Sequence, residues 1–177
     1  NQNSVLKNNV PYIKIDLRNC DEINQHFSKI DLVYYLASES IPASTWENPL
    51  SEIEKNLTPF VHFLECVAKH KVKKVVFISS AGTIYGPSNQ KVTEDSYKNP
   101  FSPHGIIKLT MEYFLNYYEL KYNLKFDIYR VSNVYGENQD TSKGLGVVNT
   151  FLEKIIAEKQ IKIFGDGKNI RNYIYIK

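Results

Sequence analysis

One stretch near the middle of the chain decides the fold. It reads Val75-Val76-Phe77-Ile78-Ser79-Ser80-Ala81-Gly82-Thr83-Ile84-Tyr85-Gly86-Pro87. Its first half is a short apolar run, which is typical of a strand covered on both faces in a parallel sheet. Its second half is rich in hydroxyl groups and glycine and predicts a loop that continues to about Asn99. Ligands in parallel sheets bind just past the carboxyl ends of the strands, so this junction is a candidate site.

Two other runs have the same buried-strand character, one at residues 32–37 and one at 126–131. Segments of helical character separate the three runs, at about 49–70 and 103–122. In the first of these segments Pro59 either introduces a kink or starts a new helix. Strands that alternate with helices of this length predict βαβ units, so the three strands should be parallel neighbours in an α/β fold.

Weaker patterns flank this centre. Residues 12–16 alternate with period two and predict a strand. Asp21 and Glu22 predict the start of a short helix that continues to about Phe27, because acidic residues favour a helix N-terminus. After the third buried run the sequence predicts a polar loop, a helix at about 147–158, and short strands at 161–164 and 173–176.

The composition of the 177 residues excludes several classes of protein. Hydrophobic residues make up 42% and charged residues 23%, which is enough for a packed core and excludes wholesale disorder. The 22 Lys and Arg against 19 Asp and Glu give a net charge of +3, spread along the chain. Neither nucleic acid nor a membrane is therefore an expected partner, and no apolar run reaches the ~20 residues of a membrane helix. Cys20 and Cys66 form no disulfide framework or metal cluster, so we expect a cytoplasmic protein without a metal.

Four more segments accompany the central stretch. They are Leu36-Ala37-Ser38, Ser102-Pro103-His104-Gly105-Ile106-Ile107-Lys108, Arg130-Val131-Ser132-Asn133-Val134-Tyr135-Gly136 and Phe164-Gly165-Asp166-Gly167-Lys168-Asn169-Ile170-Arg171. In this order the five segments resemble the NAD-dependent epimerase/dehydratase family, the extended short-chain dehydrogenases that act on nucleotide sugars. The resemblance covers nearly the whole chain.

The resemblance implies a Rossmann-type doubly wound parallel sheet with NAD as the cofactor. The Gly-rich motif that follows the family's first strand is absent, so we expect the chain to lack the first two strands and to be incomplete at both ends. A partial NAD-binding domain is expected at residues 1–145, and the start of a small substrate-binding lobe at 146–177.

The resemblance also implies site residues, position by position. The residues that would contact the cofactor are Asp16, Leu17, Ala37, Ser38, Asn56, Ser79 and Lys108. Lys108 would bind the nicotinamide ribose and lower the pKa of the neighbouring base. Asn133 and Arg171 would hold the diphosphate of a UDP-sugar, because a guanidinium grips phosphate oxygens bidentately. We expect these two residues to lie on the same cleft as Ser79 and Lys108.

Two positions depart from the family pattern. His104 stands where the family has its catalytic tyrosine, four residues before Lys108, and Ala81 stands where it has a catalytic Ser or Thr. His104 is either a substitute base, since an imidazole titrates near neutral pH, or a helix-terminal polar residue in a chain that has changed its chemistry. Thr83 and Ser80 are the candidate replacements for the missing hydroxyl. Alternation along extended backbone would favour Thr83 or Ser79 over Ser80.

The sequence therefore predicts a nucleotide-sugar epimerase of the UDP-glucose 4-epimerase type, with His104, Lys108, Thr83 and Ser80 as catalytic residues. The alternative is a non-catalytic or truncated member that binds nucleotide or nucleotide sugar. A 4,6-dehydratase is less favoured, because its Asp-Glu pair is replaced by Gly82-Thr83. The helix at 103–122 is apolar over more than one face, and in the resembled family this helix builds a homodimer interface, so a homodimer is expected.

Overall fold

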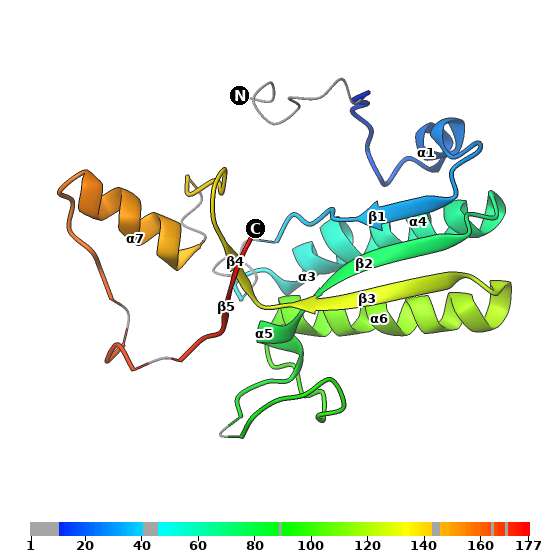
Figure 1. Ribbon diagram of the computed structural model, residues 1–177. Helices are drawn as coiled ribbons and strands as arrows, with labels where there is room; N and C mark the ends of the chain where they lie inside the picture. The colour runs from blue at the N-terminus through cyan, green and yellow to red at the C-terminus, as the bar shows by residue number, and fades with distance from the viewer. Residues whose placement is uncertain (1–10, 41–45, 89, 143–145, 164, 169) are drawn as a thin grey trace.

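Three parallel strands form the centre of the computed structural model, which describes residues 11–40, 46–88, 90–142, 146–163, 165–168 and 170–177. These strands are β1 (Leu32–Tyr35), β2 (Lys74–Ser80) and β3 (Lys125–Val131), in the order β1-β2-β3 (Figure 1). Tyr35 of β1 pairs with Phe77 of β2, which pairs with Ile128 of β3. The predicted α/β fold with three parallel neighbours is confirmed.

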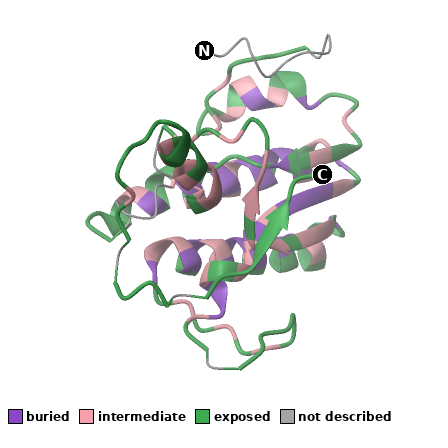
Figure 2. Cartoon of the chain, turned by 60° about the vertical axis from the view of Figure 1, so that its left-hand side comes forward, coloured by how far each residue is buried: buried purple, intermediate pink, exposed green. Residues whose placement is uncertain are grey.

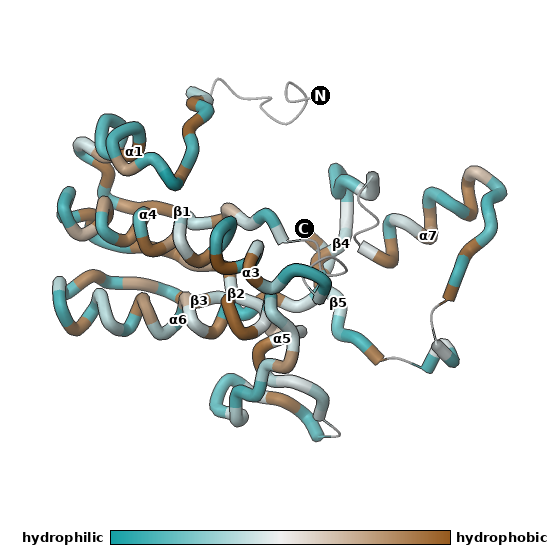
Figure 3. Tube along the Cα trace, turned by 180° about the vertical axis from the view of Figure 1, so that it is seen from behind, coloured by the Kyte–Doolittle hydropathy of each residue, from teal (hydrophilic) through white to brown (hydrophobic). Residues whose placement is uncertain are grey.

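Two long helices, α4 (Thr58–Lys69) and α6 (Pro103–Tyr122), cover one face of this sheet. Figure 3, seen from behind, shows both helices in front of the strands. Their inner faces bury Phe60, Leu64 and Leu115 completely against Phe77 of the central strand. The buried residues in Figure 2 gather on the sheet and on these helices. Burial of such large apolar side chains is the main source of stability in a domain of this size.

The opposite face of the sheet is open in the described part of the chain. Tyr34 of β1 is 62% exposed and Tyr129 of β3 is 53% exposed. The expectation that the runs at 32–37 and 126–131 are buried on both faces is therefore wrong for the described chain, because β1 has one buried residue, Tyr35, and β3 has none. The strand β1 is also shorter than expected. A continuous apolar run shows that a strand could have helices packed on both of its faces. It does not show that the chain contains the helices for the second face.

The N-terminal segment contains the helix α1 (Cys20–His26), close to its predicted position. Asn19 caps it, because its side-chain oxygen accepts hydrogen bonds from the N–H groups of Asp21 and Glu22. The strand predicted at residues 12–16 is wrong, since residues 11–16 have no regular structure. A strand needs a hydrogen-bonded neighbour, and no described strand pairs with this segment, although Ile15 and Leu17 still pack against the core.

The segment before β2 consists of α3 (Pro49–Glu52), a π-helical turn η1 (Ile53–Leu57) and α4. The N–H of Thr58 donates to the carbonyl of Ile53, five residues back. Pro59 follows in the first turn of α4, where its missing N–H removes no bond within that helix. Of the two alternatives for Pro59, the structure has the start of a new helical segment, reached through a π turn.

The loop expected after β2 begins with a one-turn helix, α5 (Ala81–Ile84). The alternation argument that grouped Ser79 with Thr83 therefore fails, because the backbone is extended only to Ser80. Gly105 of α6 packs directly against α5, since a Cβ atom at this position would lie 2.5 Å from the carbonyl oxygen of Thr83. This close approach fixes the start of α6 beside the end of β2.

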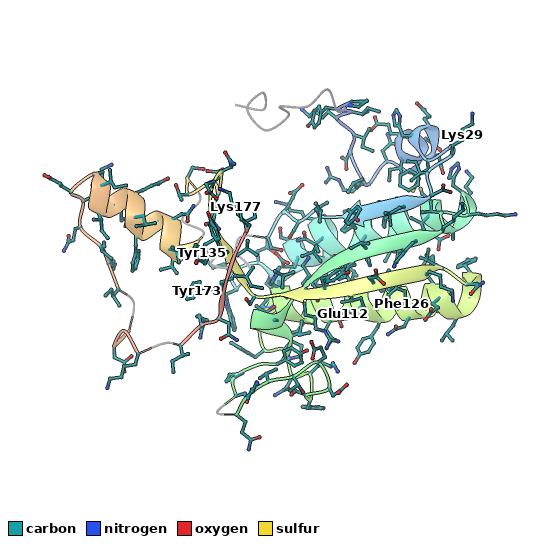
Figure 4. All side chains as sticks on the ribbon, in the orientation of Figure 1. Lys29, Glu112, Phe126, Tyr135, Tyr173 and Lys177 are labelled. Atoms are coloured by element: carbon teal, nitrogen blue, oxygen red, sulfur yellow. The ribbon has the colours of Figure 1, made fainter. Side chains whose placement is uncertain are left out.

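The C-terminal part forms a second, two-stranded parallel sheet from β4 (Asn133–Tyr135) and β5 (Tyr173–Tyr175). Tyr135 pairs with Tyr175 across this sheet, with ring centroids 5.4 Å apart, and its ring is 6.4 Å from that of Tyr173 (Figure 4). The helix α7 (Val147–Ile156) appears as predicted, two residues shorter, whereas β4 was expected to be loop. Residues 161–163 form no strand, which corrects that prediction, and Phe164 lies outside the described residues. Within the described chain, no helix is both long and apolar enough to cross a membrane.

The contact between Gly105 and α5 gives a stability test. Gly105→Ala forces a methyl group against the Thr83 carbonyl and should lower the free energy of unfolding by about 1–3 kcal/mol, as overpacking does. Gly82→Ala is the matched control, because a Cβ atom there meets nothing within 4 Å. Urea denaturation measures both changes. Equal stability of the two variants would contradict the close packing of α6 on α5.

Candidate active site

The candidate site lies where β2 ends and α6 begins. Figure 1 shows α3, α5 and the first turn of α6 gathered at this end of the sheet. Ser102 caps α6 by accepting a hydrogen bond from the N–H of Gly105 at 3.1 Å, and Pro103 occupies the first turn. His104 and Lys108 are one turn apart and therefore share one face of the helix.

Lys108 is tied to the end of β2. Its Nζ donates a hydrogen bond to the carbonyl of Ile78 at 2.9 Å and lies 4.9 Å from the centre of the Phe77 ring. Burial lowers the pKa of Lys108 to about 8, although the carboxylate of Glu52 opposes this shift. The lysine is therefore positively charged at neutral pH and loses its charge in mildly alkaline solution.

His104 lies between that lysine and a carboxylate. Its Nδ1 is 3.8 Å from Oε2 of Glu52, and both side chains are largely buried. Burial and the charge of Lys108 lower the pKa of His104, whereas Glu52 raises it in part. The imidazole is neutral at pH 7 and can accept a proton, which is the state that a general base requires.

Glu52 is the site residue that the sequence analysis missed. It is 4% exposed, and its Oε2 accepts hydrogen bonds from the Oγ of Ser40 at 2.8 Å and from Nδ2 of Asn56 at 3.3 Å. Asn56 also accepts a bond from the N–H of Glu39 at 2.9 Å. The only signal in the sequence is the spacing of four residues between Glu52 and Asn56, which is common on exposed helices and so does not single out a site.

The structure separates the three hydroxyl candidates. Ser79 is buried and its Oγ donates to Oε1 of Glu112 at 2.5 Å, which directs this hydroxyl toward α6. Among the described residues, the Oγ1 of Thr83 is a buried polar atom without a hydrogen-bond partner. Ser80 is half-buried at the end of β2. Thr83 therefore has an unused hydroxyl close to the start of α6.

Four of the residues predicted to contact the cofactor line one cavity of about 510 Å³. They are Asp16, Leu17, Ala37 and Ser38, joined by Arg18 and Lys55. Hydrogen bonds from Arg18 lower the pKa of Asp16 to about 2, so its carboxylate is ionised and can accept hydrogen bonds. This mixture of an ionised carboxylate, a hydroxyl and cationic side chains fits the hydroxyl and phosphate groups of a dinucleotide. Asn56, Ser79 and Lys108 are not among the lining residues of this cavity.

A second cavity, of about 890 Å³, lies beside β4 and β5. Asn133 and Arg171 both line it, together with Lys154, Lys162 and Tyr173. Ser79 and Lys108 do not line it, so the single cleft expected for the four residues is not formed by the described chain. The reason is structural, because β4 leaves the main sheet and pairs with β5 instead.

Cys20 and Cys66 are not among the described residues that line the two cavities. Cys20 and Cys66 are free thiols. In the residues that the structure describes, no group of three or more His, Cys, Asp or Glu side chains is arranged to hold a metal ion.

A βαβαβ sheet with polar side chains past the carboxyl ends of its strands defines a Rossmann-type nucleotide-binding protein. The model of the NAD dependent epimerase/dehydratase family matches residues 1–177, and the chain belongs to this family. The family prediction from the sequence is confirmed, and so is NAD as the family's cofactor.

Individual relatives agree with this assignment. The chain is 31% identical over 176 residues to a putative UDP-glucose 4-epimerase of Methanocaldococcus jannaschii, covering 96% of this chain and 58% of the relative. It is 34% identical to the UDP-glucose 4-epimerase of Mycolicibacterium smegmatis, covering 84% of this chain and 48% of that protein. The chain thus spans about half the length of these relatives.

Solved structures confirm the Rossmann-type fold. The UDP-glucose 4-epimerase of Thermotoga maritima, in a structure with UDP-glucose, superposes with a TM-score of 0.89 at 32% identity. That match covers 94% of this chain and 55% of the other. The enzyme of Thermus thermophilus, in complex with NAD, gives a TM-score of 0.86 at 31% identity and covers 94% and 56%. The roles of individual residues in this chain stay predictions.

The buried ion pair behind Ser79 gives a second stability test. Glu112 accepts hydrogen bonds from Nε and Nη2 of Arg130 at 3.2 and 2.8 Å as well as from Ser79. Glu112→Ala should lower the free energy of unfolding by about 3–5 kcal/mol, because it leaves a partly buried guanidinium unpaired. Glu119→Ala on the same helix removes only an exposed pair with Lys125 and should cost less than about 1 kcal/mol. Similar losses in chemical denaturation would contradict the role given to Glu112.

Proposed function

We propose that this chain is the catalytic part of a nucleotide-sugar epimerase of the UDP-glucose 4-epimerase type. The observation that carries the proposal is the buried arrangement of a neutral imidazole, a lysine and an unpartnered hydroxyl at the end of β2, in a chain of this family. His104 and Lys108 supply the first two groups, and Thr83 supplies the third. Relatives named as UDP-glucose 4-epimerases support the substrate class.

The cofactor would be held by Asp16, Leu17, Ala37 and Ser38, which share one cavity, and by Lys108. The cofactor would supply reversible hydride transfer at a sugar carbon, which would allow the configuration of that carbon to be inverted. Asn56 supports this site indirectly, because its side chain accepts the N–H of Glu39 in the loop after β1. Ser79 donates its hydroxyl to Glu112 and pairs with Arg130 in the sheet, so the cofactor contact proposed for it rests on the family resemblance.

The nucleotide sugar would bind at the second cavity. Arg171, Lys154 and Lys162 give it a concentration of positive charge suited to a diphosphate. Asn133 adds an amide at the start of β4. Residues 1–145 would then form the cofactor-binding part and residues 146–177 the start of the substrate-binding lobe, in a cytoplasmic protein.

The proton transfers would be carried out by the chain's own side chains. His104, neutral at pH 7, would take the proton of the reacting sugar hydroxyl and later give it back. Thr83 would orient that hydroxyl by a hydrogen bond, with Ser80 as the second candidate. Lys108 would stay positively charged and bind the ribose, while its charge disfavours a protonated His104.

The proposed enzyme would be a homodimer. Apolar side chains of α6 are exposed on the face away from the core, among them Tyr113, Tyr117 and Leu120. A second copy of α6 on this face would bury them.

A second candidate function is a non-catalytic member that binds nucleotide or nucleotide sugar. The departures at His104 and Ala81 favour it, because they replace the two hydroxyl-bearing residues of the family pattern. The two candidates share the same cavities and differ only in turnover. A 4,6-dehydratase is less favoured, since Gly82 and Thr83 occupy the positions of its acid/base pair.

Substrate binding can be tested at Arg171. Arg171→Ala should weaken the affinity for UDP-glucose about tenfold or more, because a charged hydrogen bond to the diphosphate is lost. Lys168→Ala is the control, since Lys168 is an exposed cation of the same loop that does not line the cavity. Isothermal titration calorimetry measures both affinities, and an unchanged Arg171→Ala affinity would contradict the assignment.

Catalysis can be tested by the pH dependence of epimerisation. Activity should rise as His104 loses its proton, at a pH below its ordinary value of 6.5, and should fall again as Lys108 deprotonates near pH 8. His104→Gln should lower kcat about 100-fold or more in NAD-loaded protein, while the exposed His26→Gln should leave it unchanged. If the unsubstituted protein binds UDP-sugars but gives no epimer at any pH, the non-catalytic candidate is favoured.

A further inference from the structure

Glu52 is a buried carboxylate for which the proposed reaction has so far no use. All its hydrogen bonds in the described chain involve neutral donors, the hydroxyl of Ser40 and the amide of Asn56. The nearest group that can carry a positive charge is the imidazole of His104, with 3.8 Å between Oε2 and Nδ1. Burial of a carboxylate is unfavourable unless charge and hydrogen bonds compensate it, so this arrangement requires an explanation.

We propose that Glu52 is a positioning residue for His104. Its carboxylate keeps the imidazole proton on Nδ1, so that Nε2 carries the lone pair, and it stabilises the imidazolium that forms when Nε2 accepts a proton. This inference rests on the proposed function, because it gives His104 the role of the base. The inferred interaction itself exists in the protein without substrate and can be measured there.

The proton balance of the step is simple. The O–H bond of the sugar hydroxyl breaks and an N–H bond forms at Nε2 of His104, which leaves an imidazolium. The proton on Nδ1 stays there and is not transferred to Glu52, so the carboxylate keeps its charge throughout. The proton on Nε2 returns to the sugar oxygen at the end of the cycle, which restores the neutral imidazole. In hydrolytic triads a carboxylate orients a histidine through a hydrogen bond. The 3.8 Å between Oε2 of Glu52 and Nδ1 of His104 is longer than such a bond, so in this structure Glu52 acts on the ring through its charge.

The charges around His104 explain why such a partner is needed. Lys108, on the same face of α6, disfavours the protonated imidazole, and burial acts in the same direction. Glu52, from α3, is the group that acts in the opposite direction. Lys108 therefore weakens the imidazole as a base, and Glu52 is the anion that partly compensates this effect.

The position of Glu52 is itself held firmly. Ser40 and Asn56 both donate hydrogen bonds to the same oxygen of Glu52, Oε2. The Nδ2 of Asn56 also donates to the Oγ of Ser40 at 3.2 Å, so the three side chains hold one another in place. Glu52 is the last residue of α3 and Asn56 lies in the π turn η1, so the non-standard backbone of this segment sets both side chains. Single π turns inside helices occur frequently at functional sites.

The test is an NMR titration of the His104 ring in this chain, with nitrogen shifts that report the tautomer. The chain has four histidines, and the spectrum of His104→Gln assigns the signal of His104. In the unsubstituted chain the proton should reside on Nδ1. Glu52→Gln should lower the proton affinity of His104 about tenfold or more, since one charge at this distance is removed from a largely buried site, and should mix the two tautomers. The glutamine oxygen can still accept from Ser40 and Asn56, so the fold should be retained.

Two further variants complete the design. Glu52→Asp keeps the charge and should retain most of the proton affinity of His104, even if the tautomers begin to mix. Glu54→Gln removes the same charge from an exposed position two residues along and should change neither quantity. An unchanged tautomer and titration midpoint in Glu52→Gln would overturn the inference.

Kinetics separate this inference from the proposed function. In NAD-loaded protein, Glu52→Gln should lower kcat about tenfold with KM for the UDP-sugar unchanged, because the base is weakened and the substrate contacts remain. Epimerisation without any effect of Glu52→Gln on the His104 titration would sink the positioning role alone. A clear effect on the titration in a protein without epimerase activity would sink the proposed function and support the coupling of the two side chains.

Discussion

The candidate site depends on how α6 docks against the end of β2. Two α6 side chains four residues apart hold consecutive residues of that strand: Lys108 bonds to the carbonyl of Ile78, and Glu112 accepts the hydroxyl of Ser79. Because both lie on one face of the helix, the two bonds fix its height and its rotation together. Gly105 then allows the first turn to touch α5. His104 has little freedom left, and its imidazole is held within 4 Å of Glu52 as a consequence.

This docking also explains why the polar groups of the region tolerate burial. Arg130 of β3 satisfies Glu112, and it also donates to the hydroxyl of Tyr85 at 2.7 Å and to the carbonyl of Glu94 at 2.9 Å. The network thus connects β3 with the loop after α5, and it keeps that loop beside the candidate site. When all members of a charged network are paired, the network selects one arrangement of the helices and strands over others. This selectivity is a larger effect than its net contribution to the free energy of unfolding.

Helices and strands that have a local signal could be predicted from the sequence. Elements whose formation depends on strand pairing or on tertiary contacts could not. The strands at 75–79 and 126–131 and the helix at 103–122 were predicted correctly because their runs of apolar residues are a local signal in the sequence. The order of the strands in the sheet follows from βαβ geometry. The run at 126–131 is nevertheless not buried in the described chain. The strand expected at 12–16 failed because alternation cannot supply a partner strand. The turn α5 was missed because it is only four residues long and three of them, Gly82, Thr83 and Ile84, are poorer helix formers than alanine. The π turn η1 was missed because it depends on how α3 and α4 are packed. At the site, the family pattern pointed to His104, Lys108 and Thr83, but Glu52 enters only through folding of a segment that lies about fifty positions away from His104 in sequence.

If His104 stands where the family has a tyrosine, as the resemblance implies, the electrostatic surroundings that favour a base differ between the two residues. A phenol becomes a base by losing a proton, so it gains a negative charge and is helped by nearby cations such as Lys108. An imidazole is already a base when neutral, and it gains a positive charge when it works. Lys108 then acts against it, and a buried carboxylate acts for it. In the proposed mechanism the carboxylate of Glu52, fixed by two hydrogen bonds, would stabilise the imidazolium while it exists. The resting imidazole is neutral, so the hydrogen bonds of Ser40 and Asn56, and not His104, support the buried carboxylate in that state. The pairing with Glu52 would then be what allows a histidine to act as the base at this position.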